Sequence, residues 1–290
     1  MKYSYSIDLH MHTTVSDGTD TPEEILVSVK EAGIELFSVT DHDSLNGGKA
    51  IMNMLTETDP RFIPGVEFSC KDEEGKYHIL GYGYDPDSEG IREIVEMGHQ
   101  YRMDKVQSRM EMLEKEYGFT FPEEEVRKLL ESETPGKPHI GNLMVKYGFA
   151  ETKEQAIKQY INHIRIHSEY VRPEEAISGI LESGGIPVLA HPSYGNGDQF
   201  IIGDDMDRRL RRLMDYGLRG VEAFYSGFTE RLRAEMLAFA EKYGLYVTAG
   251  SDYHGKNKLV VLGDTGLKGA PQLPDGLCRF LDEIQDHMTN

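Results

Sequence analysis

The chain has 290 residues, of which 50 are acidic and 31 basic, so its formal net charge at pH 7 is −19. A negative charge of this size repels long polyanions, which excludes non-specific binding to duplex nucleic acid or to anionic membranes as the leading function. A small anionic substrate stays open, because bound cations would reverse the potential locally. The sequence has two cysteines, no signal-peptide pattern, and no apolar run near the roughly 20 residues of a membrane helix. We therefore expect a cytoplasmic protein, long enough for one α/β domain that carries an insertion.

Short apolar runs alternate with helical patterns along most of the chain. The predicted strands are Tyr3–Leu9, Glu35–Thr40, Arg61–Ser69, Lys76–Tyr84, Ile186–Ala190, Arg219–Tyr225 and Leu245–Gly250. Thr21 and Pro22 predict the start of a first helix and Gly33 its end, because a hydroxyl cap, an early proline and a final glycine are typical helix signals. Further helices are predicted over Pro173–Ser183 and Phe228–Tyr243. This alternation favours a parallel sheet, and seven such strands predict a closed or nearly closed barrel.

Residues 90–170 break the alternation. Helical patterns without strand signals cover Ile91–Tyr117, Pro122–Glu131, His139–Tyr147 and Lys153–Ile164. We interpret residues 90–170 as a mainly helical insertion that leaves the α/β domain after the fourth strand and returns before the fifth. Residues 1–89 and 171–290 would then form the α/β domain. The insertion is expected to cap the ends of the strands, and the alternative is a helical excursion without a functional role.

Histidines and acids lie at or just after the ends of the predicted strands. His10 and His12 stand in DLHMH, and because residues two apart point to the same side of a strand, both can reach one metal ion. The further candidate ligands are Asp17, His42, Glu67, His78, His191, Asp252 and His254. Imidazole and carboxylate are the ligands that many divalent metals prefer, and α/β enzymes place their chemistry at strand ends. Together these positions predict a multinuclear metal site.

Individual positions in this set also have structural interpretations. Two half-buried core histidines would give the same HxH spacing. Asp41 is explained more simply as a turn cap than as a ligand, and Asp43 either caps a helix or supports a ligand from outside. His78 alone would be an ordinary strand histidine, and Glu222 is either a supporting acid or a common strand-end carboxylate. The recurrence of histidine or acid at nearly every strand end favours the metal site.

The order of these motifs carries a family resemblance. HxH, D, DHD, GVE, a strand histidine, AHP and SDxH follow one another over residues 1–85 and 186–265. This order resembles the motif set of the polymerase and histidinol phosphatase (PHP) family of metal-dependent phosphoesterases. The resemblance implies a distorted seven-stranded (β/α)7 barrel and two or three divalent ions, with Mn, Zn or Fe as the metals. The implied ligands are His10, His12, Glu67 and Asp252 for the first ion, Glu67, His78 and His191 for the second, and Asp17, His42 and His254 for the third.

The insertion resembles that of the PHP branch that hydrolyses nucleoside 3′,5′-bisphosphates and short oligonucleotides. That branch carries a Pro-His pair, which corresponds here to Pro138 and His139. Family members often have Arg before the Pro, where this chain has Lys137, and an ammonium lacks the bidentate fork of Arg. Lys137 and His139 are therefore implied to bind substrate phosphates. Arg102 is a further candidate, for which a solvated helix face is the alternative.

The expected activity is hydrolysis of a phosphate monoester of a small nucleotide, from nucleoside 3′,5′-bisphosphate to 5′-monophosphate and phosphate, or hydrolysis of a short oligonucleotide. The resemblance assigns catalysis by metal-activated water to Asp17, His42, Glu67, Asp252 and His254. The expected partner is a small phosphorylated substrate, and neither a long duplex nor a membrane. Three alternatives stay open: a phosphatase for a non-nucleotide phosphate such as histidinol phosphate, a metal-dependent amide or lactone hydrolase, and a non-catalytic metal-binding module.

Overall fold

The computed structural model describes residues 4–195 and 199–289, so the predicted strand start at Tyr3 lies outside the described residues. The described chain is a mixed α/β structure, as predicted, and its strands lie in two sheets. The small sheet contains the parallel strands β1 (Ile7–Asp8), β2 (Leu36–Phe37) and β3 (Arg61–Phe62). The large sheet contains, in spatial order, β4 (Gly65–Asp72), β5 (Gly75–Tyr82), β6 (Ile186–Leu189), β7 (Gly220–Tyr225) and β8 (Tyr246–Gly250).

The large sheet is not wholly parallel, which corrects the prediction from strand–helix alternation. β5 runs antiparallel to both β4 and β6, whereas β6, β7 and β8 are mutually parallel. The reason is the connection: β4 and β5 are joined only by Glu73 and Glu74, and a parallel connection needs about a dozen residues or more. The predicted strand Arg61–Ser69 is also divided, because Pro64 separates β3 from β4 and has no N–H to donate to a ladder.

Two isolated bridges connect the small sheet to the large sheet, one next to β8 and one at β4. Met11, just after β1, forms an isolated parallel bridge with Tyr253, just after β8. His42, after β2, forms another with Glu67 of β4. The described residues therefore contain eight strands in two adjoining sheets, and the predicted single ring of seven strands is not confirmed. These bridges bring the chain segments that follow β1, β2 and β8 next to β4.

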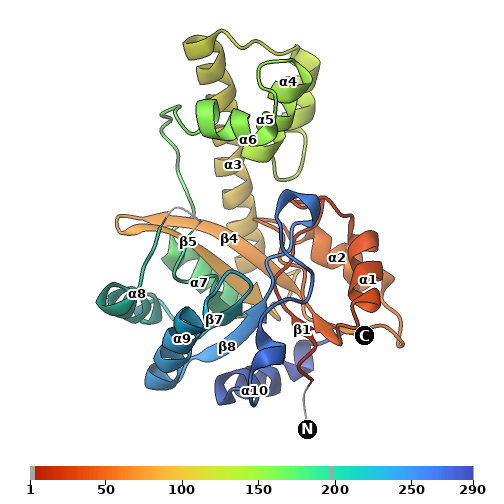
Figure 1. The fold of residues 1–290 in the computed structure, drawn as a ribbon, viewed down its shortest axis with the longest axis vertical. Helices are drawn as coiled ribbons and strands as arrows, with labels where there is room; N and C mark the ends of the chain where they lie inside the picture. Colours follow the sequence, from red (N-terminus) through yellow and green to blue (C-terminus); the bar gives the residue numbers. More distant parts are fainter. Residues whose placement is uncertain (1–3, 196–198, 290) are drawn as a thin grey trace.

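Helices cover the outer faces of both sheets (Figure 1). α1 (Pro22–Glu31) begins as predicted, with Thr21 accepting a hydrogen bond from the Glu24 N–H, and Gly33 follows its end with a φ of +64°. The other helices of the α/β part are α2 (Asn46–Met54), α7 (Pro173–Glu182), α8 (Gly203–Asp215), α9 (Glu230–Tyr243) and α10 (Asp275–Glu283). The sequence patterns did not predict α2, α8 or α10, which are the shortest or most charged of these helices.

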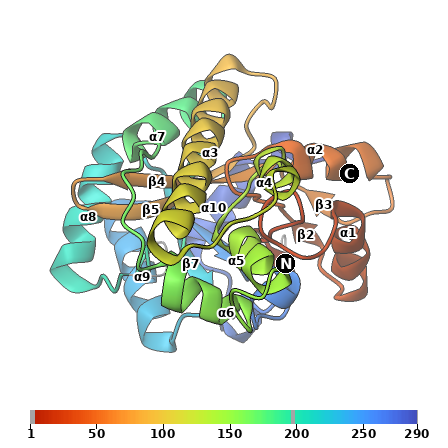
Figure 2. The same cartoon turned by 90° about the horizontal axis from the view of Figure 1, so that it is seen from above.

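A group of helices lies on one side of the sheets. α3 (Glu89–Tyr117) rises from β4 and β5 and leads to α4 (Glu123–Leu130), α5 (Lys137–Lys146) and α6 (Lys153–Gln155), which continues as a π-helical turn over Ala156–Ile161 (Figures 1 and 2). These helices enclose a hydrophobic cluster of their own, which includes Val106, Leu113, Ile140, Met144 and Ile161. Seen from above, α3 to α6 lie in front of the strands (Figure 2). Within the described ranges, none of the helices combines the length and the apolar character needed to cross a membrane.

Candidate metal centre

The segment after β1 carries the HxH motif into the interior. Leu9 and Met11 are fully buried in the hydrophobic clusters on one side of this segment. His10 and His12 alternate with them and are also fully buried, so both imidazoles face the same polar interior. Glu222 fixes the orientation of the His10 ring, because its Oε1 lies 3.0 Å from His10 Nδ1, on the side of the ring away from Glu67. With the proton on Nδ1, the lone pair of His10 Nε2 points into the centre.

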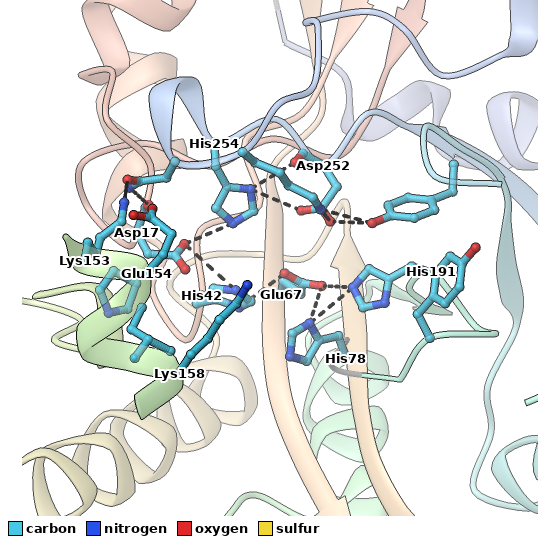
Figure 3. Close-up of a pocket in the computed structure, with 16 residues that line it drawn as sticks. Asp17, His42, Glu67, His78, Lys153, Glu154, Lys158, His191, Asp252 and His254 are labelled. Carbon is cyan, nitrogen blue, oxygen red and sulfur yellow. Dashed lines mark hydrogen bonds and ion pairs between the residues drawn. The ribbon is translucent and has the colours of Figure 1, made fainter. Parts of the chain in front are cut away.

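Glu67 lies in the middle of this centre (Figure 3). It is 1% exposed and comes from β4, where Val66 and Phe68 pack into the core on either side of it. Its Oε2 lies 3.3 Å from His10 Nε2 and 3.2 Å from His12 Nε2. Its Oε1 lies 2.9 Å from His78 Nδ1 and 3.1 Å from His191 Nε2. His42 Nδ1 also lies 3.2 Å from Oε2, so one oxygen of the carboxylate faces three imidazoles and the other faces two.

Asp252 completes the first of these groups. Its Oδ1 lies 3.6 Å from His10 Nε2 and 3.5 Å from His12 Nε2. A third group forms around Asp17, whose Oδ1 lies 3.2 Å from His254 Nε2 and 4.0 Å from His42 Nε2. The structure thus brings together all nine side chains that the motifs single out: His10, His12, Asp17, His42, Glu67, His78, His191, Asp252 and His254.

The backbone is strained at the edge of this centre. Among the described residues, those other than glycine with a positive φ are Asp43, His191 and Asp252, at 52°, 25° and 59°. Such conformations cost about 1–3 kcal/mol each and persist only where the surroundings enforce them. The His191 N–H donates to Glu222 Oε2 at 2.7 Å, and the Asp252 N–H donates to the His10 carbonyl at 2.7 Å. Two of these three positions, His191 and Asp252, are candidate ligands, and Asp43 follows the candidate ligand His42 directly.

The donor atoms fit a metal ion better than they fit one another. Several lie buried without a hydrogen-bond partner among the described residues: His10 Nε2, His12 Nε2, Asp17 Oδ1, His42 Nδ1 and His191 Nδ1. Each such atom costs about 1–3 kcal/mol if it stays unpaired. The donor separations given above run from 2.9 to 4.0 Å, and ligands that each lie about 2.1 Å from one ion are roughly 3–3.5 Å apart. A set of imidazole and carboxylate donors at this spacing is suited to divalent transition metals.

The pKa shifts in the centre also favour a bound metal ion. Burial by itself lowers the pKa of His10, but the negative charges of Glu67 and Glu222 outweigh it and raise that pKa well above its usual value. Burial raises the pKa of Glu67, but His78 and His10 outweigh it and hold that pKa well below its usual value. Burial lowers the pKa of His42 to about 3, so this imidazole is neutral at pH 7 and keeps a free lone pair. The centre thus favours added positive charge, which a divalent cation supplies.

Two acids outside the nine support the site in ways that the sequence left open. Asp41 accepts hydrogen bonds from the Thr13 N–H at 2.8 Å and from the Ser16 hydroxyl at 2.5 Å, so it caps the loop after the HxH motif. Asp43 accepts a hydrogen bond from the Ser69 N–H and pairs with Arg102. Arg102 is consequently half-buried and paired, and the alternative of a solvated helix face is wrong for it.

The other predicted substrate-binding residues lie beside the centre. Lys137 and His139 are in the first turn of α5. Lys137 Nζ donates to Asn162 Oδ1 at 2.7 Å, and the His139 Nδ1 accepts a hydrogen bond from the Gly136 N–H at 3.1 Å. Pro138, between them, lines a cavity that adjoins the centre.

A cavity of about 410 Å³ opens above the centre, between the helices α5 and α6 and the α/β part. It is lined by Lys158 and Ile157 from the helical side and by Tyr225 and Lys258 from the other side. Seven of the nine candidate ligands, all except His10 and His12, also line it (Figure 3). Lys258 Nζ contacts the Tyr225 hydroxyl at 3.0 Å and also pairs with Asp252. Sequence reasoning missed these lining residues, because lysines and a tyrosine in loops and helices have no spacing that marks them.

Comparisons with known proteins agree with this geometry. The PHP domain family matches residues 8–171, and the chain belongs to this family. It is 28% identical, over 86% of its own length and 94% of the relative's, to the phosphoribosyl 1,2-cyclic phosphate 1,2-diphosphodiesterase of Eggerthella lenta. It is 27% identical to the 5′-3′ exoribonuclease Rnm of Escherichia coli (93% and 94% covered) and 24% identical to the 3′,5′-nucleoside bisphosphate phosphatase of Chromobacterium violaceum (86% and 87%).

A solved structure from Bifidobacterium adolescentis, of a candidate metal-dependent phosphoesterase, superimposes with a TM-score of 0.81. It is 27% identical to this chain, and the match covers 96% of each chain. A protein from Chromobacterium violaceum, described as an amidohydrolase with bound sulfate and no metal, has the same fold, with a TM-score of 0.80 at 23% identity and 98% coverage of each chain. The chain is a metal-dependent hydrolase of phosphate esters.

Proposed function

We propose that this phosphoesterase removes one phosphate from a small nucleotide, converting a nucleoside 3′,5′-bisphosphate to the 5′-monophosphate, or hydrolyses a short oligonucleotide. The observation that carries the proposal is the position of Glu67, whose two oxygens face separate groups of imidazoles at the floor of a 410 Å³ cavity. Relatives named for nucleoside bisphosphate and for 5′-3′ exoribonuclease activity support the nucleotide class of substrate.

Two or three divalent ions, with Mn, Zn or Fe as the candidates, would occupy the centre. The proposed ligands are His10, His12, Glu67 and Asp252 for the first ion, Glu67, His78 and His191 for the second, and Asp17, His42 and His254 for the third. When bound, such ions lower the pKa of coordinated water and neutralise the charge of the phosphate ester. The catalytic roles predicted for Asp17, His42, Glu67, Asp252 and His254 are all proposed through this shared centre.

Hydrogen bonds fix which ring nitrogen carries the proton in two of the candidate ligands, His254 and His10. His254 Nδ1 lies 2.9 Å from the Asp252 carbonyl oxygen, so it carries the ring proton and leaves Nε2 free toward Asp17. The Glu222 carboxylate fixes the proton of His10 on Nδ1 in the same way. From the two sides of the cavity, Lys158 and Lys258 supply cationic groups that can bind and orient phosphoryl oxygens.

The proposal includes the division of the chain. Residues 1–89 and 171–290 would form one distorted barrel from the two adjoining sheets, and residues 90–170 would form a cap over it. The separate hydrophobic cluster of α3 to the π-helical turn supports this division. A cap that closes one side of the cavity favours a small or single-stranded substrate over a long duplex, as does the net charge of −19.

The test is phosphate release from adenosine 3′,5′-bisphosphate by Mn-loaded protein, with a chelator control. We expect chelator-sensitive release that leaves AMP, and an Asp252→Asn variant that loses about 10³-fold in rate while keeping its circular dichroism spectrum. Asp286→Asn, at an exposed residue near the C-terminus, is the matched control and should keep full activity. Cleavage of p-nitrophenyl phosphate without cleavage of the bisphosphate would retain the phosphoesterase and discard the nucleotide substrate.

A further inference from the structure

Aromatic side chains line one part of the 410 Å³ cavity and continue from it to the surface. Tyr225 and Tyr194 line the cavity, and their ring centroids lie 6.1 Å apart. The His191 ring lies 5.5 Å from that of Tyr225, and the Phe200 ring lies 6.2 Å from that of Tyr194. The exposed fraction rises along this series, from 7% for Tyr225 to 63% for Phe200. We call Tyr225, Tyr194 and Phe200 the aromatic wall, which leads from a candidate metal ligand to solvent.

The inner part of the aromatic wall is fixed by contacts within the protein. The Tyr194 hydroxyl donates a hydrogen bond to the Gly227 carbonyl oxygen at 3.0 Å, and the Tyr194 ring lies 5.6 Å from the buried ring of Phe228. The Tyr225 hydroxyl donates to Asp252 Oδ2 at 3.1 Å. Both hydroxyl groups are thereby engaged, and the rings remain as contact surface for a ligand. A ring that is fixed before binding loses little conformational entropy when a ligand packs against it.

The outer end of the aromatic wall leaves apolar surface in water. Single exposed apolar residues are ordinary on protein surfaces, but contiguous ones beside a cavity mark a binding site. The described residues expose eight large apolar side chains, and four of these come from segments 200–202 and 259–261. The first segment contacts Tyr194, and the second directly follows Lys258, which lines the cavity. The four side chains are Phe200, Ile202, Leu259 and Val261.

The chemistry of the aromatic wall fits a nucleobase. A base is a flat, uncharged ring system, and proteins bind unpaired bases mainly by stacking them on aromatic side chains. The aromatic wall carries no charge of its own, so it is unsuited to a phosphate or a carboxylate. A cation stands next to it, because Lys258 Nζ lies 5.3 Å from the centroid of the Tyr225 ring. A nucleotide joins a base to a phosphate through one sugar, and this cavity likewise places an aromatic surface beside a centre suited to phosphate.

We propose that the aromatic wall binds the base of the substrate by stacking, through Tyr194 and Phe200, while the phosphate lies at the metal centre. This inference rests on the proposed phosphoesterase function and narrows its substrate class to esters that carry a base. A sugar phosphate without a base is then a poor substrate. Tyr194 and Phe200 are thereby specificity-determining residues that no sequence motif marked.

The kinetic test compares two substrates that differ only in the base, 2′-deoxyadenosine 3′,5′-bisphosphate and 1,2-dideoxyribose 3,5-bisphosphate. Phe200→Ala should lower kcat/KM for the nucleotide by about 5- to 50-fold, mainly through KM, because it removes a stacking surface. The value for the abasic substrate should change by less than about twofold. Tyr194→Leu should likewise reduce the preference for the nucleotide, and Tyr194→Phe, which keeps the ring, should retain it.

Val27→Ala, at an exposed apolar residue of α1, is the matched control and should alter neither substrate. Phe200 is 63% exposed, so its replacement should leave the circular dichroism spectrum unchanged. Equal losses of kcat/KM for both substrates in Phe200→Ala, or no loss for the nucleotide, would overturn the proposal.

A spectroscopic measurement separates the proposal from the activity itself. The chain contains no tryptophan, so Phe200→Trp introduces a single indole at the outer end of the aromatic wall. A base that stacks on this indole quenches its fluorescence. In Mn-loaded protein we expect adenosine 5′-monophosphate to quench the signal and ribose 5-phosphate to leave it unchanged. Val27→Trp, with its indole on α1, should respond to neither compound.

The outcomes of this titration distinguish the base site from the proposed function. Quenching by adenosine 5′-monophosphate alone, in a protein that does not hydrolyse nucleotide substrates, would keep the base site and reject the proposed function. Equal quenching by both compounds, or quenching by neither, would reject the stacking site, whatever the activity.

Discussion

Replacement of Glu67 by Gln tests whether one carboxylate joins two metal-binding groups. In the structure its Oε2 faces His10 and His12, and its Oε1 faces His78 and His191, at 2.9–3.3 Å. One substitution therefore removes a charged ligand from both groups at once. At a free metal concentration of 100 times Kd, one occupied site stabilises the native state by about 2.7 kcal/mol, so two contribute about 5 kcal/mol. For a chain of this size that raises Tm by roughly 8–10 °C.

The assay is thermal unfolding of wild-type and Glu67→Gln protein, with Mn²⁺ and with EDTA, combined with elemental analysis of the bound metal. We expect the wild-type shift to fall below about 3 °C in the variant, and bound metal to fall in parallel. Glu116→Gln, at an exposed residue near the end of α3, should keep the full shift. A Glu67→Gln protein that retains the wild-type shift and metal content would refute the bridging role.

Three further predictions follow from supporting contacts. Glu222→Gln should weaken metal binding by about 10- to 100-fold, measured by competition with a chelating dye, because Glu222 orients two imidazole-bearing residues from behind; unchanged affinity would contradict this. Lys105→Met should stabilise the protein by about 1–2 kcal/mol at pH 7 in urea unfolding. The pKa of Lys105 is about 7 in the native protein and 10.5 in the unfolded chain, so between these pH values the unfolded chain holds more protons. The free energy of unfolding of the wild type therefore rises with pH across that window, and that of the variant should rise less. A variant profile as steep as the wild-type profile would contradict the shift. Gly47→Ala should destabilise by about 1–3 kcal/mol, because its Cβ would collide with the Asp41 carboxylate, whereas Gly269→Ala, with open space around it, should be neutral; equal unfolding midpoints would contradict this.

The contrast between Thr21 and the β4–β5 hairpin shows how far local sequence signals reach. Thr21, Pro22 and Gly33 were sufficient to predict α1, because capping and chain reversal depend on residues within one helical turn. The strand Lys76–Tyr84 was also predicted, but its direction was not, because the sheet position of a strand depends on its partners. Only the two-residue connection Glu73-Glu74 shows that β5 reverses direction.

The candidate ligands were identifiable because metal chemistry limits them to few residue types. His10 and His12 are two apart at a strand end, and Asp252 and His254 repeat that spacing, so their common direction follows from strand geometry alone. The roles of Glu222 and Arg102 could not be decided in this way. Glu222 lies 212 positions from His10 in the chain, and Arg102 lies 59 positions from Asp43.

The sequence by itself determined the candidate ligands, the alternation of strands and helices, and the helical character of residues 90–170. Periodicity and residue chemistry act over a few positions, so they can be read without a fold. Only the tertiary structure decided which oxygen of Glu67 faces which imidazole, and that Lys105 and Arg109 of α3 are half-buried. Both depend on packing between elements that are far apart in the chain, which places residues distant in sequence within a few ångströms of one another.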